Sequence, residues 1–285
     1  MLLSTSSDIH QDARKAKHFF SLRDAIYACK AAGFTHIDLT LAEHCGHESP
    51  FAGTEWLKWL DDVQDALADT GLIVNQTHTL FYKHIDDAEE LAFKERMVER
   101  CIQASALVGA KWTVMHILRT IDLNLNAEQK EEAMSRNVDY FRPYGDIARK
   151  YGVGIAIENG LSGFYHSAEE LMELLARLGD EAFGLCWDTG HANITGQDQP
   201  ASILKMGDRL KCLHINDNHA QRDEHLLPYM GTVDFAPIIA AIRALQASPI
   251  LTFEARGATR ILPAAVRPDI LRAAVRIGEC LLETT

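Results

Sequence analysis

The chain alternates between short apolar, β-branched runs and longer runs whose apolar residues recur at helical spacing. The short runs predict eight strands, and several are almost continuously apolar, as is typical of strands buried on both faces. The predicted strands are Leu2–Ser6, Thr35–Leu41, Leu72–Leu80, Trp112–Leu118, Gly154–Glu158, Phe183–Asp188, Cys212–Asn216 and Ile250–Glu254.

The longer runs predict eight helices, one after each strand. Two begin with capping signals, because Ser21 is followed by Asp24 and Ser167 by Glu170. Several end at a glycine that leads into the next strand. The predicted helices are Leu22–Ala32, Glu55–Asp69, Glu89–Val108, Ala127–Tyr151, Ala168–Leu178, Pro200–Met206, Phe235–Leu245 and Arg267–Leu282.

Such an alternation gives either a closed parallel barrel or an open, doubly wound sheet. The sequence has no G-x-G-x-x-G motif after a strand and no P-loop, which disfavours a nucleotide-binding open sheet. No linker rich in proline, glycine or serine interrupts the chain. We therefore predict the α/β class and a single (β/α)₈ TIM barrel over residues 1–285, with its active site at the C-terminal ends of the strands.

Composition narrows the class of partner. Hydrophobic residues make up 47% of the 285 residues, and the formal net charge is −12. This balance disfavours binding to nucleic acid or to an anionic membrane. Met1 to Lys17 lacks the apolar region of a secretory signal, and no apolar run reaches the length of a membrane span. The six cysteines form no C-x-x-C pair, which indicates reduced core thiols and a cytoplasmic protein.

Polar residues gather where the predicted strands end. The third and fourth strands carry His78 and His116 near their ends, and the fifth to eighth carry another four such residues. In a closed barrel, strand ends form a ring around one mouth, so these side chains should converge. The four residues are Glu158, Asp188, His214 and Glu254. Three carboxylates and one imidazole suit Zn²⁺, Mn²⁺, Mg²⁺ or Co²⁺, so we predict one divalent metal ion there.

Four ordered motifs carry a family resemblance across the chain. They are Ile157-Glu158-Asn159, Trp187-Asp188-Thr189-Gly190-His191, His214-Ile215-Asn216-Asp217 and Phe253-Glu254. Their order and spacing resemble the xylose-isomerase-like TIM-barrel superfamily of sugar and sugar phosphate isomerases and epimerases. That superfamily also includes inosose dehydratases and abasic-site endonucleases.

The resemblance implies roles for individual residues. In the epimerase branch, the positions of Glu158, Asp188, His214 and Glu254 hold the metal, and the two glutamates also move protons. The position of His191 faces substrate oxygens.

Five further residues match, in order, additional zinc ligands of the abasic-site endonucleases, although the stretch from His214 to Asp223 looks shorter here. They are His78, His116, His191, Asp223 and His225. Three interpretations stay open: binding of substrate hydroxyls or support of the metal ligands, a second metal ion, or no role.

We predict an isomerase or epimerase of a sugar or sugar phosphate that acts through a metal-stabilised enediolate, with Glu158 and Glu254 as acid and base. The alternatives are a keto-polyol dehydratase, a metal-dependent abasic-site endonuclease or phosphodiesterase, and a non-catalytic sugar-binding barrel. Near the mouth, positive charge comes from Lys83, Arg119, Arg222 and Arg256. They suffice for one phosphate group, and Arg256 is the predicted substrate-binding cation.

Two long loops follow predicted strands. Residues 217 to 233 form a 17-residue loop, which we expect to fold over the mouth and bring Asp223 or His225 near the metal or the substrate. Residues 43 to 53 read as a lid loop, with a His/Cys metal cluster around Cys45 as the alternative. The expected partner is a small-molecule sugar. The sequence leaves the choice of sugar, the metal and the oligomeric state, a homo-oligomer included, undecided.

Overall fold

A computed structural model of the chain describes residues 1–11, 20–82, 85–118, 125–161, 166–247 and 249–283. Eight parallel strands form one sheet in the order β7-β6-β5-β4-β3-β2-β1-β8. The strands are β1 (Leu3–Ser6), β2 (His36–Thr40), β3 (Ile73–His78), β4 (Trp112–His116), β5 (Gly154–Glu158), β6 (Phe183–Asp188), β7 (Leu210–His214) and β8 (Leu251–Phe253).

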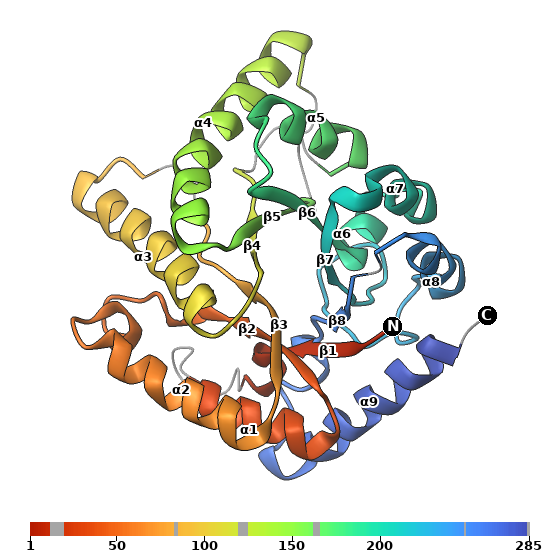
Figure 1. The fold of residues 1–285 in the computed structure, drawn as a ribbon. Coiled ribbons are helices and arrows are strands. Elements are labelled where there is room, and N and C mark those ends of the chain that lie inside the picture. Colours follow the sequence, from red (N-terminus) through yellow and green to blue (C-terminus); the bar gives the residue numbers. More distant parts are fainter. Residues whose placement is uncertain (12–19, 83–84, 119–124, 162–165, 248, 284–285) are drawn as a thin grey trace.

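The sheet closes on itself between β7 and β8. The amide of Ile215, just after β7, donates to the Thr252 carbonyl at 2.8 Å, and the Glu254 amide donates to the Ile215 carbonyl at 3.1 Å. β8 also pairs with β1 in parallel. Viewed down its axis, the closed sheet is surrounded by the helices (Figure 1). The predicted (β/α)₈ barrel is confirmed.

The helices follow the predicted order, with bounds within two residues of those expected. Ser167 and Glu170 form the predicted capping box at the start of α5. The helices are α1 (Leu22–Ala32), α2 (Trp56–Thr70), α3 (Ala88–Leu107), α4 (Ala127–Tyr151), α5 (Ala168–Leu178), α6 (Thr189–Ile194), α7 (Gln199–Met206), α8 (Phe235–Ala244) and α9 (Arg267–Glu283). Within the described ranges, none of these helices is both long and apolar enough to cross a membrane.

The short helix α6 was not predicted. It begins directly after β6 because the Asp188 side chain caps it, accepting a 2.7 Å hydrogen bond from the His191 amide. The helix includes Gly190, a poor helix former, so the segment reads as a turn in the sequence. On Gly190, a Cβ atom would lie 1.9 Å from Oδ1 of Asn216, so only glycine fits beside that side chain.

The barrel interior has an apolar half and a polar half. Val114, Ala156, Cys186 and Cys212, from β4 to β7, form a small buried cluster separate from the main core. On the side of β1, β2, β3 and β8, the interior instead holds hydrogen-bonded polar side chains from Ser4, Asp38, Asn75, Gln76 and Thr252. The main core lies between the strands and the helices.

An irregularity in β3 supplies two of these polar side chains. Val74 lies opposite Ile37 and Gln76 lies opposite Asp38, so β3 has one residue, Asn75, more than β2 between the two pairs. Such bulges re-aim side chains. Here the bulge allows both Asn75 and Gln76 to hydrogen-bond inside the barrel.

The loop after β2 contains two 3₁₀ turns, Leu41–His44 and Pro50–Ala52. His44 is buried and packs between Phe20 and Trp59, with ring centroids 5.3 and 5.1 Å away. Cys45 Sγ lies 3.4 Å from Cys101 Sγ. Among the described residues, this pair and His44 are not part of any group spaced to bind a metal, which disfavours the His/Cys cluster. Trp56 and Trp59 pack against the core.

His44 makes stability depend on pH. Burial lowers its pKa from 6.5 to about 4, so below pH 6.5 the unfolded chain binds a proton that the folded protein excludes. Stability should therefore fall as the pH drops through this window, by about 2 kcal/mol between pH 7.5 and pH 5 for this residue alone. His44→Phe should remove that part of the loss in urea denaturation. Equal losses in the variant and the wild type would contradict this assignment.

Candidate active site and metal centre

Four side chains converge at the C-terminal mouth of the barrel. The strands place them there: β5 ends at Glu158, β6 at Asp188 and β7 at His214, and Glu254 directly follows β8. Their ligand atoms all lie within 4.8 Å of one another. All four residues are buried, with Glu254 the most exposed at 8%. The structure thus brings together the whole predicted metal-ligand set.

His214 lies at the centre of this group. Its Nδ1 atom is 2.5 Å from Oε1 of Glu158 and 3.4 Å from Oε2 of Glu254. Asp188 is held by two donors: the His191 amide, and Asn216 Nδ2, which donates to Oδ2 at 2.7 Å. Hydrogen bonds therefore hold Glu158, Asp188 and His214 in place, and Glu254 lies against His214.

The residues present fit a divalent cation. Three buried carboxylates in one small volume repel one another, and burying such charge without compensation is costly. Burial raises the pKa of Glu254 to about 7, and the Glu158 and Asp188 carboxylates add to that rise against the opposing effect of His214 and His225. A cation bound among three carboxylates and an imidazole would supply the missing positive charge.

Sequence reasoning missed a residue behind the site. Asp38, within β2, places Oδ2 3.2 Å from His214 Nε2 and accepts a 2.9 Å hydrogen bond from Gln76 Nε2. A signal was present, because an acidic residue in the middle of an otherwise apolar strand must have a partner inside the protein.

Two histidines lie beside Glu158. His78 and His116, at the ends of β3 and β4, approach each other with 3.1 Å between their Nε2 atoms. His116 Nε2 is 2.9 Å and His78 Nε2 is 3.8 Å from Oε2 of Glu158. Burial lowers the pKa of His116 to about 4, which favours the neutral imidazole. These three residues form a second group spaced to hold a metal ion.

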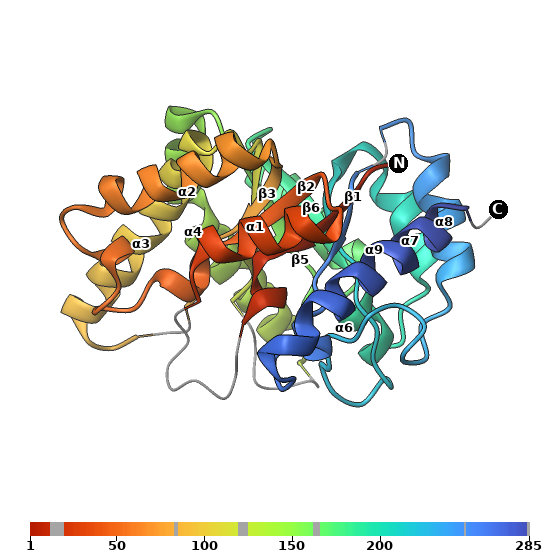
Figure 2. The same ribbon diagram turned by 90° about the horizontal axis from the view of Figure 1, so that it is seen from below.

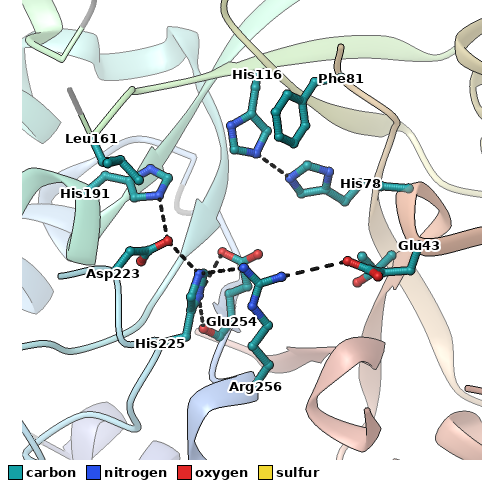
Figure 3. Close-up of a pocket in the computed structure, with 12 residues that line it drawn as sticks. Glu43, His78, Phe81, His116, Leu161, His191, Asp223, His225, Glu254 and Arg256 are labelled. Carbon is teal, nitrogen blue, oxygen red and sulfur yellow. Dashed lines mark hydrogen bonds and ion pairs between the residues drawn. The ribbon is translucent and has the colours of Figure 1, made fainter. Parts of the chain in front are cut away.

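Of the five residues that match zinc ligands of abasic-site endonucleases, the other three lie together on the opposite side of the cavity (Figure 3). They are His191, Asp223 and His225. Asp223 Oδ2 is 2.9 Å from His225 Nε2 and 3.7 Å from His191 Nε2. Burial alone would lower the pKa of both histidines, but nearby carboxylates raise that of His191 to about 10 and that of His225 to about 9. The structure therefore divides the five predicted residues into two groups.

The loop after β7 is held over the mouth by the Asp217 carboxylate. Asp217 accepts hydrogen bonds from the amides of Asn218, Gly231 and Val233 at 2.8, 2.8 and 3.0 Å. This loop lies on the same side of the barrel as α6 (Figure 2). His225 has a φ of 48°, an unusual conformation for a non-glycine residue and one that clusters at functional sites.

Arg256, three residues after β8, points into the same space (Figure 3). Its guanidinium lies 3.2 Å from His225 Nε2, 3.7 Å from Asp8 and 3.9 Å from Glu43. Of the other predicted mouth cations, Arg222 is exposed and does not line the cavity. Lys83 and Arg119 lie outside the described residues.

The side chains enclose a cavity of about 250 Å³. Clefts for drug-sized ligands span roughly 300–1,000 Å³, so this cavity suits a smaller molecule. Phe81 lines it and stacks on His116 at 4.2 Å between centroids, whereas the hydroxyl of its neighbour Tyr82 lies 2.7 Å from the Tyr144 hydroxyl of α4. The lining residues are Thr40, Ala42, Glu43, His78, Phe81, His116, Leu161, His191, Asp223, His225, Glu254 and Arg256.

Among characterised relatives, inosose dehydratase from Lactiplantibacillus plantarum is 31% identical over 33% of this chain and 37% of its own length. L-ribulose 3-epimerase from Methylomonas sp. is 29% identical over 45% of this chain and 42% of its own. An uncharacterised protein from Sinorhizobium fredii is 28% identical over 63% of this chain. The chain spans 57% of the length of that protein and less of the other two.

Solved structures share the fold over almost the whole chain. D-allulose 3-epimerase from Methylomonas sp., in complex with D-allulose, has a TM-score of 0.75 at 17% identity and covers 98% of this chain and 96% of its own. The apo form of 3-keto-D-glucoside 4-epimerase from E. coli has a TM-score of 0.74 at 17% identity and covers 98% of this chain and 100% of its own.

A family pattern described as xylose isomerase-like TIM barrel matches residues 26–277. This range includes all eight strands except β1 and every candidate ligand at the mouth. The chain therefore belongs to the xylose isomerase-like TIM barrel family.

Proposed function

We propose that this protein is a divalent-metal-dependent isomerase or epimerase of a small sugar, free or phosphorylated. The observation that carries the proposal is the convergence of Glu158, Asp188, His214 and Glu254 within 4.8 Å of one another, next to a small cavity that Glu254 lines. The relatives named L-ribulose 3-epimerase and D-allulose 3-epimerase support this reaction class.

The two glutamates take different positions relative to the substrate space. Glu254 lines the cavity, whereas Glu158 does not: it is 1% exposed, and its Oε2 atom lies 2.9 Å from His116 Nε2. A divalent cation held by Glu158, Asp188, His214 and Glu254 would supply Lewis-acid chemistry, which would make a C–H bond next to a substrate carbonyl more acidic. Glu254 is the better placed to remove or return a proton at a substrate carbon, and Glu158 serves the opposite step.

The other polar residues of the cavity orient the substrate. Nearby carboxylates raise the pKa of His191 and His225, which favours protonated rings that can donate hydrogen bonds to hydroxyl or carbonyl oxygens. His78, His116 and Arg256 complete the proposed substrate-binding set. A second cation held by His78, His116 and Glu158 is the alternative role for the first two.

A keto-polyol dehydratase is the second candidate, because relatives named inosose dehydratase match part of the chain. It would use the same proton removal and then lose a β-hydroxyl group. An abasic-site endonuclease is disfavoured by the net charge of −12. Of the described residues that line the cavity, Arg256 alone is a lysine or arginine, and a duplex-binding surface needs several contacts to phosphate.

The first test is metal content. The purified protein should hold about one equivalent of a divalent metal by elemental analysis, and the stripped protein should bind Mn²⁺, Co²⁺ or Zn²⁺ in calorimetry. His214→Ala should weaken that binding by more than the roughly 10–100-fold expected for a residue that only supports a ligand. Glu43→Gln, which removes a cavity carboxylate outside the four-residue set, is the control. A stripped wild type that binds none of these ions would refute the metal site.

The second test concerns the acid–base pair. On a panel of ketoses and 3-keto sugars, NMR should detect deuterium uptake from solvent together with inversion or isomerisation; loss of water would identify a dehydratase instead. Glu254→Gln and Glu158→Gln should each lower turnover by roughly 10²–10⁴-fold while retaining metal. One variant of an epimerase should still exchange the proton without completing inversion. Near-full turnover in both variants would exclude the two-glutamate mechanism.

The third test concerns the loop after β7. Asp223→Ala and His225→Ala should lower kcat/KM by at least about tenfold, because each removes a cavity-lining polar group, while the metal content stays near that of the wild type. Arg222→Ala, an exposed change in the same loop, should leave kcat/KM within twofold. An unchanged kcat/KM in all three variants would show that the loop only connects its neighbouring elements and plays no part in catalysis.

A further inference from the structure

We propose that Asp38 is a positioning residue that fixes the ring of His214 and thereby sets the affinity of the mouth for its cation. This inference rests on the metal site of the proposed function. It concerns a residue that does not line the cavity and is not one of the four proposed ligands.

The geometry gives the two ring nitrogens of His214 different partners. Nε2 faces Asp38 Oδ2 at 3.2 Å, and Nδ1 faces the oxygens of Glu158 and Glu254 at 2.5 and 3.4 Å. A carboxylate that accepts the proton of one nitrogen leaves the lone pair of the other for a metal ion. Asp38 therefore directs Nδ1 towards the point where the three ligand carboxylates meet.

A structural role alone does not explain a carboxylate at this position. Asp38 is fully buried, and a buried charge is costly unless it is paired and hydrogen-bonded. Its Oδ1 atom has no hydrogen-bond partner among the residues that the structure describes. A neutral side chain would fill the same space at lower cost, as Gln76 and Thr252 do nearby. The charge is explained by the imidazole that it faces.

The polar half of the barrel holds Asp38 in place. Asn75 Nδ2 donates to Thr252 Oγ1 at 3.0 Å and to Gln76 Oε1 at 3.3 Å, and Thr252 Oγ1 is 3.4 Å from Gln76 Oε1. Because the Gln76 oxygen is occupied on that side, its amide nitrogen is turned towards Asp38, to which it donates at 2.9 Å. Ser4 Oγ donates to Asn75 Oδ1 at 2.6 Å and so holds the end of this hydrogen-bond network that is furthest from Asp38.

The test compares Asp38→Asn with Thr252→Val. The first variant keeps the size of the side chain and an oxygen for Gln76 but removes the charge that faces His214. The second removes a buried polar group from the same network without touching His214. In Mn²⁺ and Zn²⁺ competition against a chelator, Asp38→Asn should bind about 10–100-fold more weakly than the wild type. Thr252→Val should bind within about threefold.

Thermal unfolding in EDTA separates positioning from folding. We expect both variants to lose a few degrees in Tm without metal, because both disturb buried hydrogen bonds. Only the Asp38→Asn protein should also lose metal affinity. If Asp38→Asn does not fold, Gln76→Leu is the substitute. It removes a donor to Asp38 and should weaken metal binding more than Thr252→Val does.

The outcomes separate the two proposals. Equal metal affinities for Asp38→Asn, Thr252→Val and the wild type would overturn the role of Asp38 and leave the metal site standing. A wild type that binds no divalent cation would overturn the proposed function, and the positioning role with it. If Gln76→Leu has to be used, affinity equal to that of Thr252→Val would likewise overturn the positioning role.

Discussion

Repulsion among three buried carboxylates is the constraint on which the mouth of this barrel depends. Glu158, Asp188 and Glu254 reach the same small volume because β5, β6 and β8 end around one ring. Water does not screen them there, so histidines, amides and a cation must balance their charge. The surrounding residues follow from that demand: His214 at the centre, His116 beside Glu158, and Asn216 beside Asp188.

The sequence was sufficient for the fold and for the residues at the strand ends. Continuous apolar runs mark strands covered on both faces. A polar residue at the end of such a run points towards the mouth, because elsewhere it would be buried without a hydrogen-bond partner. His78, His116, Glu158, Asp188 and His214 each follow that rule. The separation of His191, Asp223 and His225 from His78 and His116 was beyond the sequence, because it depends on the path of a long loop.

Three features escaped prediction for different physical reasons. Helix α6 depends on a side-chain cap at Asp188 and contains a glycine that local propensity would exclude. Asp38 acts across the barrel, and its partner His214 is 176 residues away in the chain. The bulge at Asn75, which turns a second amide inward, depends on strand register, and no local pattern records it. The last two features arise from contacts between strands far apart in the chain, whereas the cap on α6 is a local hydrogen bond.

The cap on α6 has an evolutionary consequence. One oxygen of Asp188 accepts the His191 amide and the other accepts Asn216, while the same carboxylate faces the mouth. A glutamate at this position has a side chain one methylene longer, so its carboxylate would occupy a different place in the mouth. It could not accept the same hydrogen bonds from the His191 amide and from Asn216. Substitution of Asp188 would therefore displace His191 as well. An evolutionary change at one of the two positions would then require a compensating change at the other. We expect the two positions to change together across the family, and to resist even conservative replacement.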